Sequence, residues 1–303
     1  MKVINYFTSF LVTALLFTGC SKNNDEEAPA PSKYITVNTG ILSRVSDDGS
    51  KFTAGDNLML YGWTGDKSNP GGSIMVVNGV KNTTSDGNLW LPEIPMLWKD
   101  TTTPHYFAAV SPAMTISDLT GIDIVLKGEL AEDDIMAANN LNGVKASDGD
   151  GKGKVAMIFD HLMSRIIVNL TYKNEFGLDS EGKPIIPEVN EATIKLVREA
   201  KLNVLGKSAT LGAGNAGAMN LVVVKAKEEY RMIAVPQTIK KGESFITLKI
   251  KNKDYIYTPA EDIVLQAGMS THIKLTVGRE AIYLEGITVN GWGEGGEHGG
   301  EAI

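Results

Sequence analysis

The sequence predicts an all-β protein built from two β-sandwich domains. Short runs of alternating or β-branched residues recur from residue 33 onward, and turn signals separate them at roughly ten-residue spacing. No segment shows the hydrophobic period of about 3.6 residues that is typical of a long amphipathic helix. A polar, glycine-rich stretch at residues 141–154 interrupts the strand pattern, as a loop or domain linker would.

In the first half of the chain, strand candidates alternate with turns. Residues 33–39 place Ile35 and Val37 on one face of a strand. The Asn78-Gly79 pair favours a hairpin turn, and residues 131–140 fit either one short helix or a strand. The other strand candidates before the glycine-rich stretch are residues 57–63, 74–77 and 105–110.

The strand pattern restarts after residue 153, which we take as the boundary between an N-terminal domain, 33–152, and a C-terminal domain, 153–303. The second set of strand candidates comprises residues 155–159, 166–172, 192–198, 221–225, 230–235, 244–251, 254–257, 272–277 and 281–289.

Residues 1–19 have the composition of a secretory signal, with Lys2 followed by an apolar run. The run is too short to span a bilayer in a mature protein. It ends in small residues before Cys20, the only cysteine, and this arrangement resembles the bacterial lipobox, with Phe17 where leucine is commoner. The resemblance implies cleavage before Cys20 and a diacylglycerol on its thiol. The alternative is a plain signal peptide with an incidental cysteine.

The segment after Cys20, residues 20–32, is polar and acidic, as a solvated tether would be. It resembles the acidic tethers of surface lipoproteins of the Bacteroidetes. The whole chain has a net charge of -7 and no basic patch, which argues against nucleic acid as a partner.

The usual chemical motifs are absent or incomplete in the sequence. The four histidines form no HExxH pattern, so we expect no zinc site. Asp160, His161 and Ser164 suggest a triad but lack a nucleophile-elbow turn. The GxGxxG match at 212–217 precedes a β-like segment instead of a helix. The acidic loop at 148–153 lacks the glutamate that completes an EF-hand. We therefore expect no catalytic residues, no metal and no cofactor.

Aromatic residues leave one binding function open. Trp63, Trp90, Trp98 and Tyr106 fit either the core of a sandwich or a platform for a glycan. Burial of the three tryptophans would exclude the platform.

Several short segments, in this order, resemble the fimbrillin family of Bacteroidetes pilus proteins, the type V pilins. They extend across nearly the whole mature chain, and the order makes the match specific. The segments are SRV at 43–45, FTAGDNL at 52–58, Trp98 with HYFAAVSP at 105–112, DIMAA at 134–138, MIFDHLMSRI at 157–166, LQAG at 265–268 and VNGW at 289–292.

The resemblance implies two transthyretin-like β-sandwich domains in tandem and a route of assembly. Such pilins reach the outer-membrane surface as lipoproteins, and a trypsin-like or gingipain-like protease cuts after the first strand. The Arg44-Val45 bond is the matching position here. A strand from another subunit then fills the groove that the lost strand leaves, which is a form of β-augmentation.

The family analogy makes residues 281–290 the donor strand, with Ile282, Leu284, Ile287 and Val289 facing a groove. The glycine-rich tail, residues 293–303, departs from the shorter ends that are common in the family. The implied partners are other pilin subunits, the protease, a host or bacterial surface receptor and the outer membrane. A pilus tip subunit, an anchor subunit that keeps its lipid, and a glycan-binding surface lipoprotein remain as alternatives.

Overall fold

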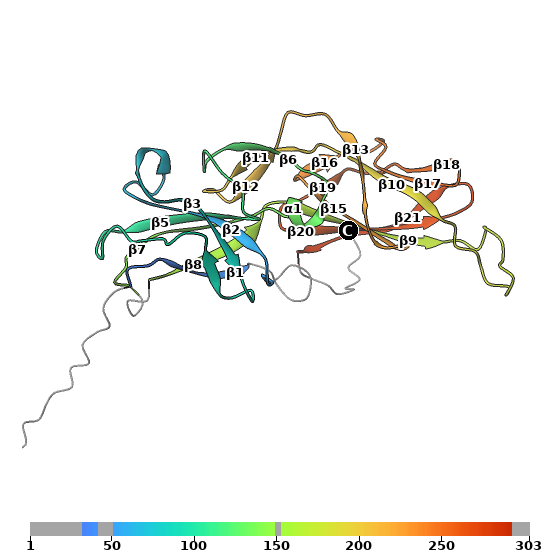
Figure 1. Ribbon diagram of the computed structural model, residues 1–303. Helices are drawn as coiled ribbons and strands as arrows, with labels where there is room; N and C mark the ends of the chain where they lie inside the picture. Colours follow the sequence, from blue (N-terminus) through green and yellow to red (C-terminus); the bar gives the residue numbers. More distant parts are fainter. Residues whose placement is uncertain (1–31, 42–50, 149–152, 293–303) are drawn as a thin grey trace, which may run out of the picture.

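The computed structural model describes residues 32–41, 51–148 and 153–292. The described chain is nearly all strand, apart from the short helices η1 (Pro70–Gly72) and α1 (Leu130–Asp133), which confirms the all-β prediction. The molecule is elongated, with β1, β2, β3, β5, β7 and β8 toward one end and β9, β10, β17, β18 and β21 toward the other (Figure 1).

A seven-stranded sheet forms one end of the molecule. Its first strand, β1, lies at one edge and pairs in parallel with β8. The strands in spatial order are β1 (Thr36–Ile41), β8 (Lys154–His161), β7 (Met136–Val144), β5 (His105–Ser111), β2 (Asn57–Thr64), β3 (Ile74–Thr84) and β4 (Trp90–Pro92).

The other end consists of a five-stranded and a four-stranded sheet that enclose a common core. The five-stranded sheet runs β14 (Val222–Lys225), β15 (Glu229–Ala234), β9 (Ser164–Tyr172), β20 (Met269–Val277) and β21 (Ile282–Gly291). The four-stranded sheet runs β13 (Gly217–Asn220), β10 (Val189–Leu196), β17 (Ile246–Ile250) and β18 (Lys253–Tyr257). A smaller three-stranded sheet runs β12 (Ser208–Leu211), β11 (Glu199–Asn203) and β6 (Ile122–Val125). A two-stranded sheet consists of β16 (Gln237–Ile239) and β19 (Ile263–Leu265).

The seven-stranded sheet is apolar on both faces because each face covers a separate core. In β5, Phe107 and Ala109 belong to the cluster beneath β1, whereas Ala108 and Val110 belong to a cluster shared with β11 and Trp292. A strand buried on both sides needs no polar alternation, which explains the uninterrupted apolar run in β5. A third cluster lies between the sheets that carry β9 and β10.

Strand pairing continues across the predicted domain boundary at residue 153. The segment 145–153 joins β7 to β8, which are antiparallel neighbours in one sheet, so the expectation of a domain linker there is wrong. The strands change from one set of sheets to the other between β8 and β9 instead. In addition, β11 of the C-terminal half pairs with β6 of the N-terminal half, and β12 pairs with the other side of β11. The number of domains stays a prediction.

The expected hairpin turn at Asn78-Gly79 is also wrong. Both residues lie within β3, and Gly79 is an extra residue opposite the pair Leu60 and Tyr61 of β2. Gly79 has a φ of 68°, so the left-handed freedom of glycine is used for a bulge instead of a turn.

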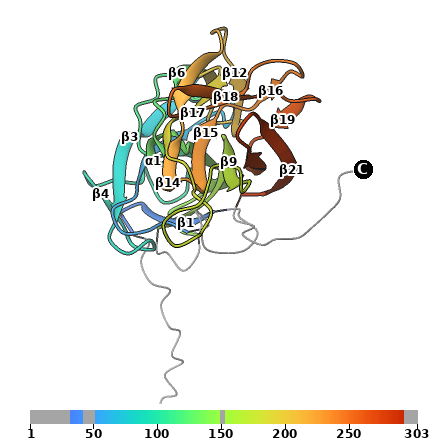
Figure 2. The ribbon, with the colours of Figure 1, turned by 90° about the vertical axis from the view of Figure 1, so that its right-hand side faces the viewer.

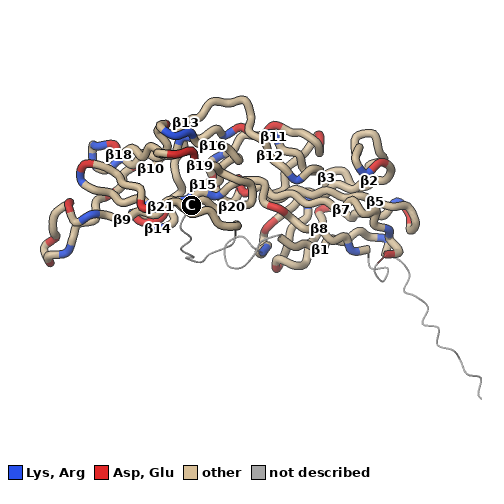
Figure 3. The backbone as a smooth tube through the Cα atoms, turned by 180° about the vertical axis from the view of Figure 1, so that it is seen from behind, with Lys and Arg blue, Asp and Glu red and all other residues tan. Residues whose placement is uncertain are grey.

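Residues 131–140 contain both elements that the sequence left open. The last residues of α1 are separated from β7 by Asp134 and Ile135. Viewed along the long axis, α1 overlaps the strands (Figure 2), and Asp133 is its one buried residue. Acidic and basic side chains are interspersed along the described chain, as Figure 3 shows.

Candidate functional site

The first strand closes a gap between two edges. Along one side, β1 pairs with β8 from Thr36 to Ile41. Just before β1, Ile35 N donates to Met96 O at 2.8 Å and Trp98 N donates to Lys33 O at 3.2 Å. Because residues 33–41 are held by main-chain contacts, another extended segment of the same length would satisfy the same donors and acceptors.

The inward side chains of β1 complete a core. Ile35 and Val37 are 1% and 7% exposed, and Ile41 packs against the same cluster. Burying one such side chain contributes about 1.5–3 kcal/mol. Loss of β1 would therefore open an apolar groove between β8 and the segment that carries Met96 and Trp98.

Gly153 shapes the groove where β1 begins. Its φ is +61°, and a Cβ at this position would lie 2.3 Å from Tyr34 O and 3.0 Å from Trp98 Nε1. The absence of a side chain lets Thr36 N donate to Gly153 O at 2.8 Å and Trp98 Nε1 donate to Tyr34 O at 3.2 Å. Glycine thus permits close approach of the backbone to β1.

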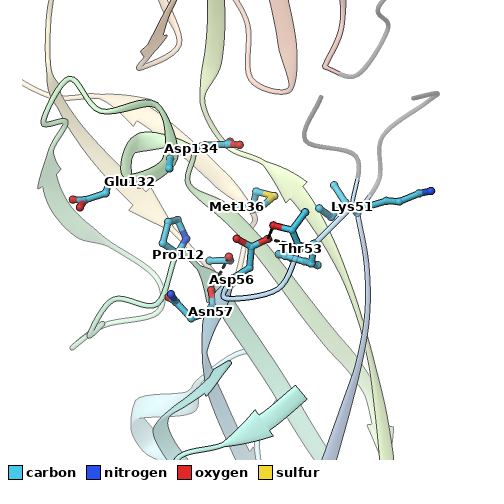
Figure 4. A pocket seen from close by; sticks show the side chains of 12 residues that line it. Lys51, Thr53, Asp56, Asn57, Pro112, Glu132, Asp134 and Met136 are labelled. Carbon is cyan, nitrogen blue, oxygen red and sulfur yellow. Dashed lines mark hydrogen bonds between the residues drawn. The ribbon is translucent and has the colours of Figure 1, made fainter. Parts of the chain in front are cut away.

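A cavity of about 440 Å³ lies at the far end of β1, next to Ile41 (Figure 4). Phe52, Pro112 and Met136 supply apolar lining, and Asp134 lines its wall. Asp134 Oδ1 lies 2.7 Å from Nδ1 of His161, the last residue of β8. The groove of β1 therefore continues into a partly polar cavity.

The last strand is an edge strand with one bulge. In β21, Leu284 pairs with Leu275 and Gly286 with Lys274, so Glu285 is the extra residue. The Thr276 hydroxyl donates to the Glu285 carboxylate on the outer face. The bulge places four residues opposite the core-facing residues of β20: Ile282, Leu284, Ile287 and Val289.

These four side chains share one face but are incompletely covered. Ile282 and Ile287 are partly buried against the core, whereas Leu284 and Val289 are 43% and 42% exposed. Burial of the exposed area in a groove would add favourable apolar contact. This face of β21 therefore still exposes apolar surface that a groove in another subunit would bury.

Contacts of Trp292 hold the C-terminal end of β21 in place. Its ring stacks on His161 with centroids 4.3 Å apart, and the Arg165 guanidinium lies 5.2 Å from the ring centroid. Trp292 N also donates to Gly268 O at 2.9 Å. Since Ile41 pairs with Phe159, two residues before His161, the ends of β1 and β21 approach the same junction of β8 and β9.

The comparisons with known proteins identify the family of this chain. The model of the fimbrillin-like family matches residues 43–292, most of the chain. The chain belongs to the fimbrillin-like family. Fimbrillins are structural subunits of fimbriae, and membership supports a fimbrial subunit at the cell surface. A comparison with curated proteins finds no match.

Solved structures share the fold of this fimbrillin-like chain. A proposed cell adhesion protein from Bacteroides uniformis aligns with a TM-score of 0.65 at 16% identity, covering 86% of this chain and 98% of the other. One from Bacteroides ovatus gives 0.65 at 15% identity over 86% and 98%. One from Bacteroides fragilis gives 0.52 at 12% identity over 89% and 99%.

Several predicted positions lie outside the described residues. Cys20, Arg44 and Val45 are among them, so their roles in lipidation and cleavage remain predictions. Most of the acidic loop at 148–153 is also outside. Within the described ranges, no cluster of three or more potential metal-ligating side chains occurs, and no helix there is long and apolar enough to cross a membrane.

The three tryptophans are buried in the core, so a glycan platform built on them is excluded. Trp63, Trp90 and Trp98 are 0%, 4% and 8% exposed. In the fimbrillin-like fold they pack against neighbouring rings, as Trp90 does edge to face against Phe52 with centroids 5.0 Å apart.

The suspected triad is not assembled. His161 pairs with Asp134 instead of Asp160, whose carboxylate binds Lys207. Ser164 Oγ donates to Met269 O at 3.4 Å. The GxGxxG segment connects β12 to β13, so the loop leads into a strand as expected.

Proposed function

We propose that this chain is a type V fimbrial subunit that is exported as a lipoprotein and assembled by strand exchange, for adhesion or biofilm. Lipid on Cys20 tethers the precursor to the outer membrane through residues 20–32. A trypsin-like or gingipain-like protease cuts between Arg44 and Val45, and β1 leaves with the lipid. A strand of another pilin subunit then occupies the groove, and β21 is the strand that this chain donates.

The proposal rests on the way in which β1 is bound in its groove. This strand is held by main-chain pairing with β8, by the main-chain bonds of residues 33–35 just before it and by a row of inward side chains. It covers the core that contains Phe107 and Phe159. Its removal leaves unpaired backbone and apolar surface, both costly in water. An exchanged strand would restore both interactions, with alternating side chains setting the register.

The position of β21 supports its role as donor. It is an edge strand that pairs only through β20 among the described strands, and two of its core-facing side chains, Leu284 and Val289, are exposed. Donation by one subunit and acceptance by the next use different surfaces, so the contact is heterologous and extends into a filament.

The test is limited trypsin digestion of lipid-free residues 21–303, followed by N-terminal sequencing and electron microscopy. A first cut that gives Val45 as the new N-terminus, followed by SDS-resistant ladders, supports the proposal. The Arg44→Gln variant should resist this cut and stay monomeric. Lys51→Gln, which removes a nearby trypsin site C-terminal to Arg44, is the matched control and should polymerise.

Two results would overturn parts of the proposal. Early cleavage at Arg44 with no polymer would favour a tip subunit or another acceptor that needs a different donor. Resistance of Arg44 to trypsin and to a purified gingipain-like protease would favour an anchor subunit that keeps its lipid.

A further inference from the structure

One inward position of β1 is polar. The row Ile35, Val37, Thr39 and Ile41 faces the core, and Thr39 is the only hydroxyl in it. Trp90 Nε1 donates to Thr39 Oγ1 at 2.9 Å. The third inward position of the groove thus provides a hydrogen-bond donor, whereas the first two are apolar.

The position of this donor does not depend on β1 alone. The Trp90 ring is 4% exposed and packs edge to face on Phe52, which in turn packs on Phe159. These rings hold the indole in place, so its N–H faces the groove whichever strand fills it. A buried donor without an acceptor is unfavourable.

Trp98 gives an instructive contrast. Its Nε1 donates to a main-chain carbonyl, that of Tyr34, at 3.2 Å. Any extended strand supplies a carbonyl there, so Trp98 does not distinguish between strands. The indole N–H of Trp90 donates to a side-chain hydroxyl, which only some strands carry, so Trp90 does distinguish between strands.

We propose that Trp90 is a specificity-determining residue of the β1 groove, selecting a donor strand that carries serine or threonine at the third inward position. The inference rests on the proposed strand exchange and narrows the partner. The fitting strand has the pattern apolar, apolar, Ser/Thr, apolar at alternate positions.

The chain's own β21 does not have this pattern. Its inward face presents Ile282, Leu284, Ile287 and Val289, so an aliphatic side chain meets Trp90 in either direction of insertion. The groove therefore binds a strand with the fitting pattern more tightly than β21, which it accepts when β21 is the only strand present, as in the digestion of the purified chain. This predicts a mixed fimbria, in which the chain accepts from one kind of subunit and donates to another.

The experiment uses trypsin-cut protein from residues 21–303 and fluorescent synthetic peptides of residues 32–41. The peptides carry Thr39, Thr39→Ser or Thr39→Val, the last of which keeps the shape and removes the acceptor. We expect the Thr39→Val peptide to bind about tenfold more weakly than the native peptide. The Thr39→Ser peptide should bind within about threefold of the native one.

Two further measurements identify the cause. In the Trp90→Phe protein, which lacks the indole donor, the native and Thr39→Val peptides should bind equally. A peptide of residues 281–291 should bind better after Ile287→Thr. Equal binding of native and Thr39→Val peptides to the unsubstituted protein would overturn the role of Trp90 and leave strand exchange standing. Binding of no peptide would overturn strand exchange itself.

Discussion

Replacing Gly153 with alanine should displace the N-terminal end of β1 and destabilise the folded protein. Two contributions to the loss of folding free energy add up. The first is the left-handed backbone, since alanine at a φ of +61° is disfavoured by about 1–2 kcal/mol. The second is the collision of the new Cβ with Tyr34 O, which lies 2.3 Å away and belongs to the backbone.

Relief of the collision requires β1 to move away. Movement would weaken the bonds from Thr36 N to Gly153 O and from Trp98 Nε1 to Tyr34 O. At about 1 kcal/mol each, these add about 2 kcal/mol. We expect Gly153→Ala to lower the free energy of unfolding by about 3–4 kcal/mol.

Gly182→Ala is the matched control. Gly182 also has a positive φ, +79°, but nothing lies within 4 Å of its Cβ position. It should show the backbone cost alone. Urea unfolding gives the two free energies, and amide hydrogen exchange at Ile35, which donates to Met96 O, reports on β1 itself. Equal destabilisation by the two substitutions, with unchanged exchange at Ile35, would refute the reasoning.

Three other predictions concern buried side chains. Ile35→Ala should lower the free energy of unfolding in urea by about 2–4 kcal/mol because Ile35 is buried, whereas the change for the exposed Asn38→Ala should stay within about 0.5 kcal/mol. Similar values for the two variants would contradict the assigned faces of the strand. Trp292→Ala should cost about 3–5 kcal/mol by emptying the site on His161, and a loss below about 1 kcal/mol would show that the ring does not fasten β21. Burial lowers the pKa of His105, so the unfolded chain takes up a proton near its ordinary pKa while the folded chain resists it. Stability should therefore fall as pH drops from 7.5 to 5.5, by less in His105→Gln, and identical melting shifts in both proteins would contradict this.

The sequence predicted the strands better than their partners. Alternation in residues 33–39 correctly placed Ile35 and Val37 on a buried face. The same alternation cannot show that β1 pairs in parallel with β8, more than a hundred residues later, because long-range pairing leaves no local signature. For the same reason the glycine-rich stretch looked like a domain linker when it joins neighbouring strands.

Glycines were the most ambiguous residues in the sequence. Gly79 next to Asn78 carries the usual signal of a hairpin turn, yet its positive φ serves a bulge against Tyr61. The hydrogen bond from Trp90 to Thr39 joins residues 51 positions apart. Nothing near either residue in the sequence marks that pair.

The bulge in β21 has a consequence for solubility. Because Glu285 shifts the side-chain frame, the apolar residues before it have even numbers and those after it have odd numbers. A strand that pairs along this edge stays in frame with all four apolar side chains only if it leaves Glu285 without a partner residue, as β20 does. The frame shift, with a carboxylate at its centre, thus protects an exposed edge from indiscriminate aggregation.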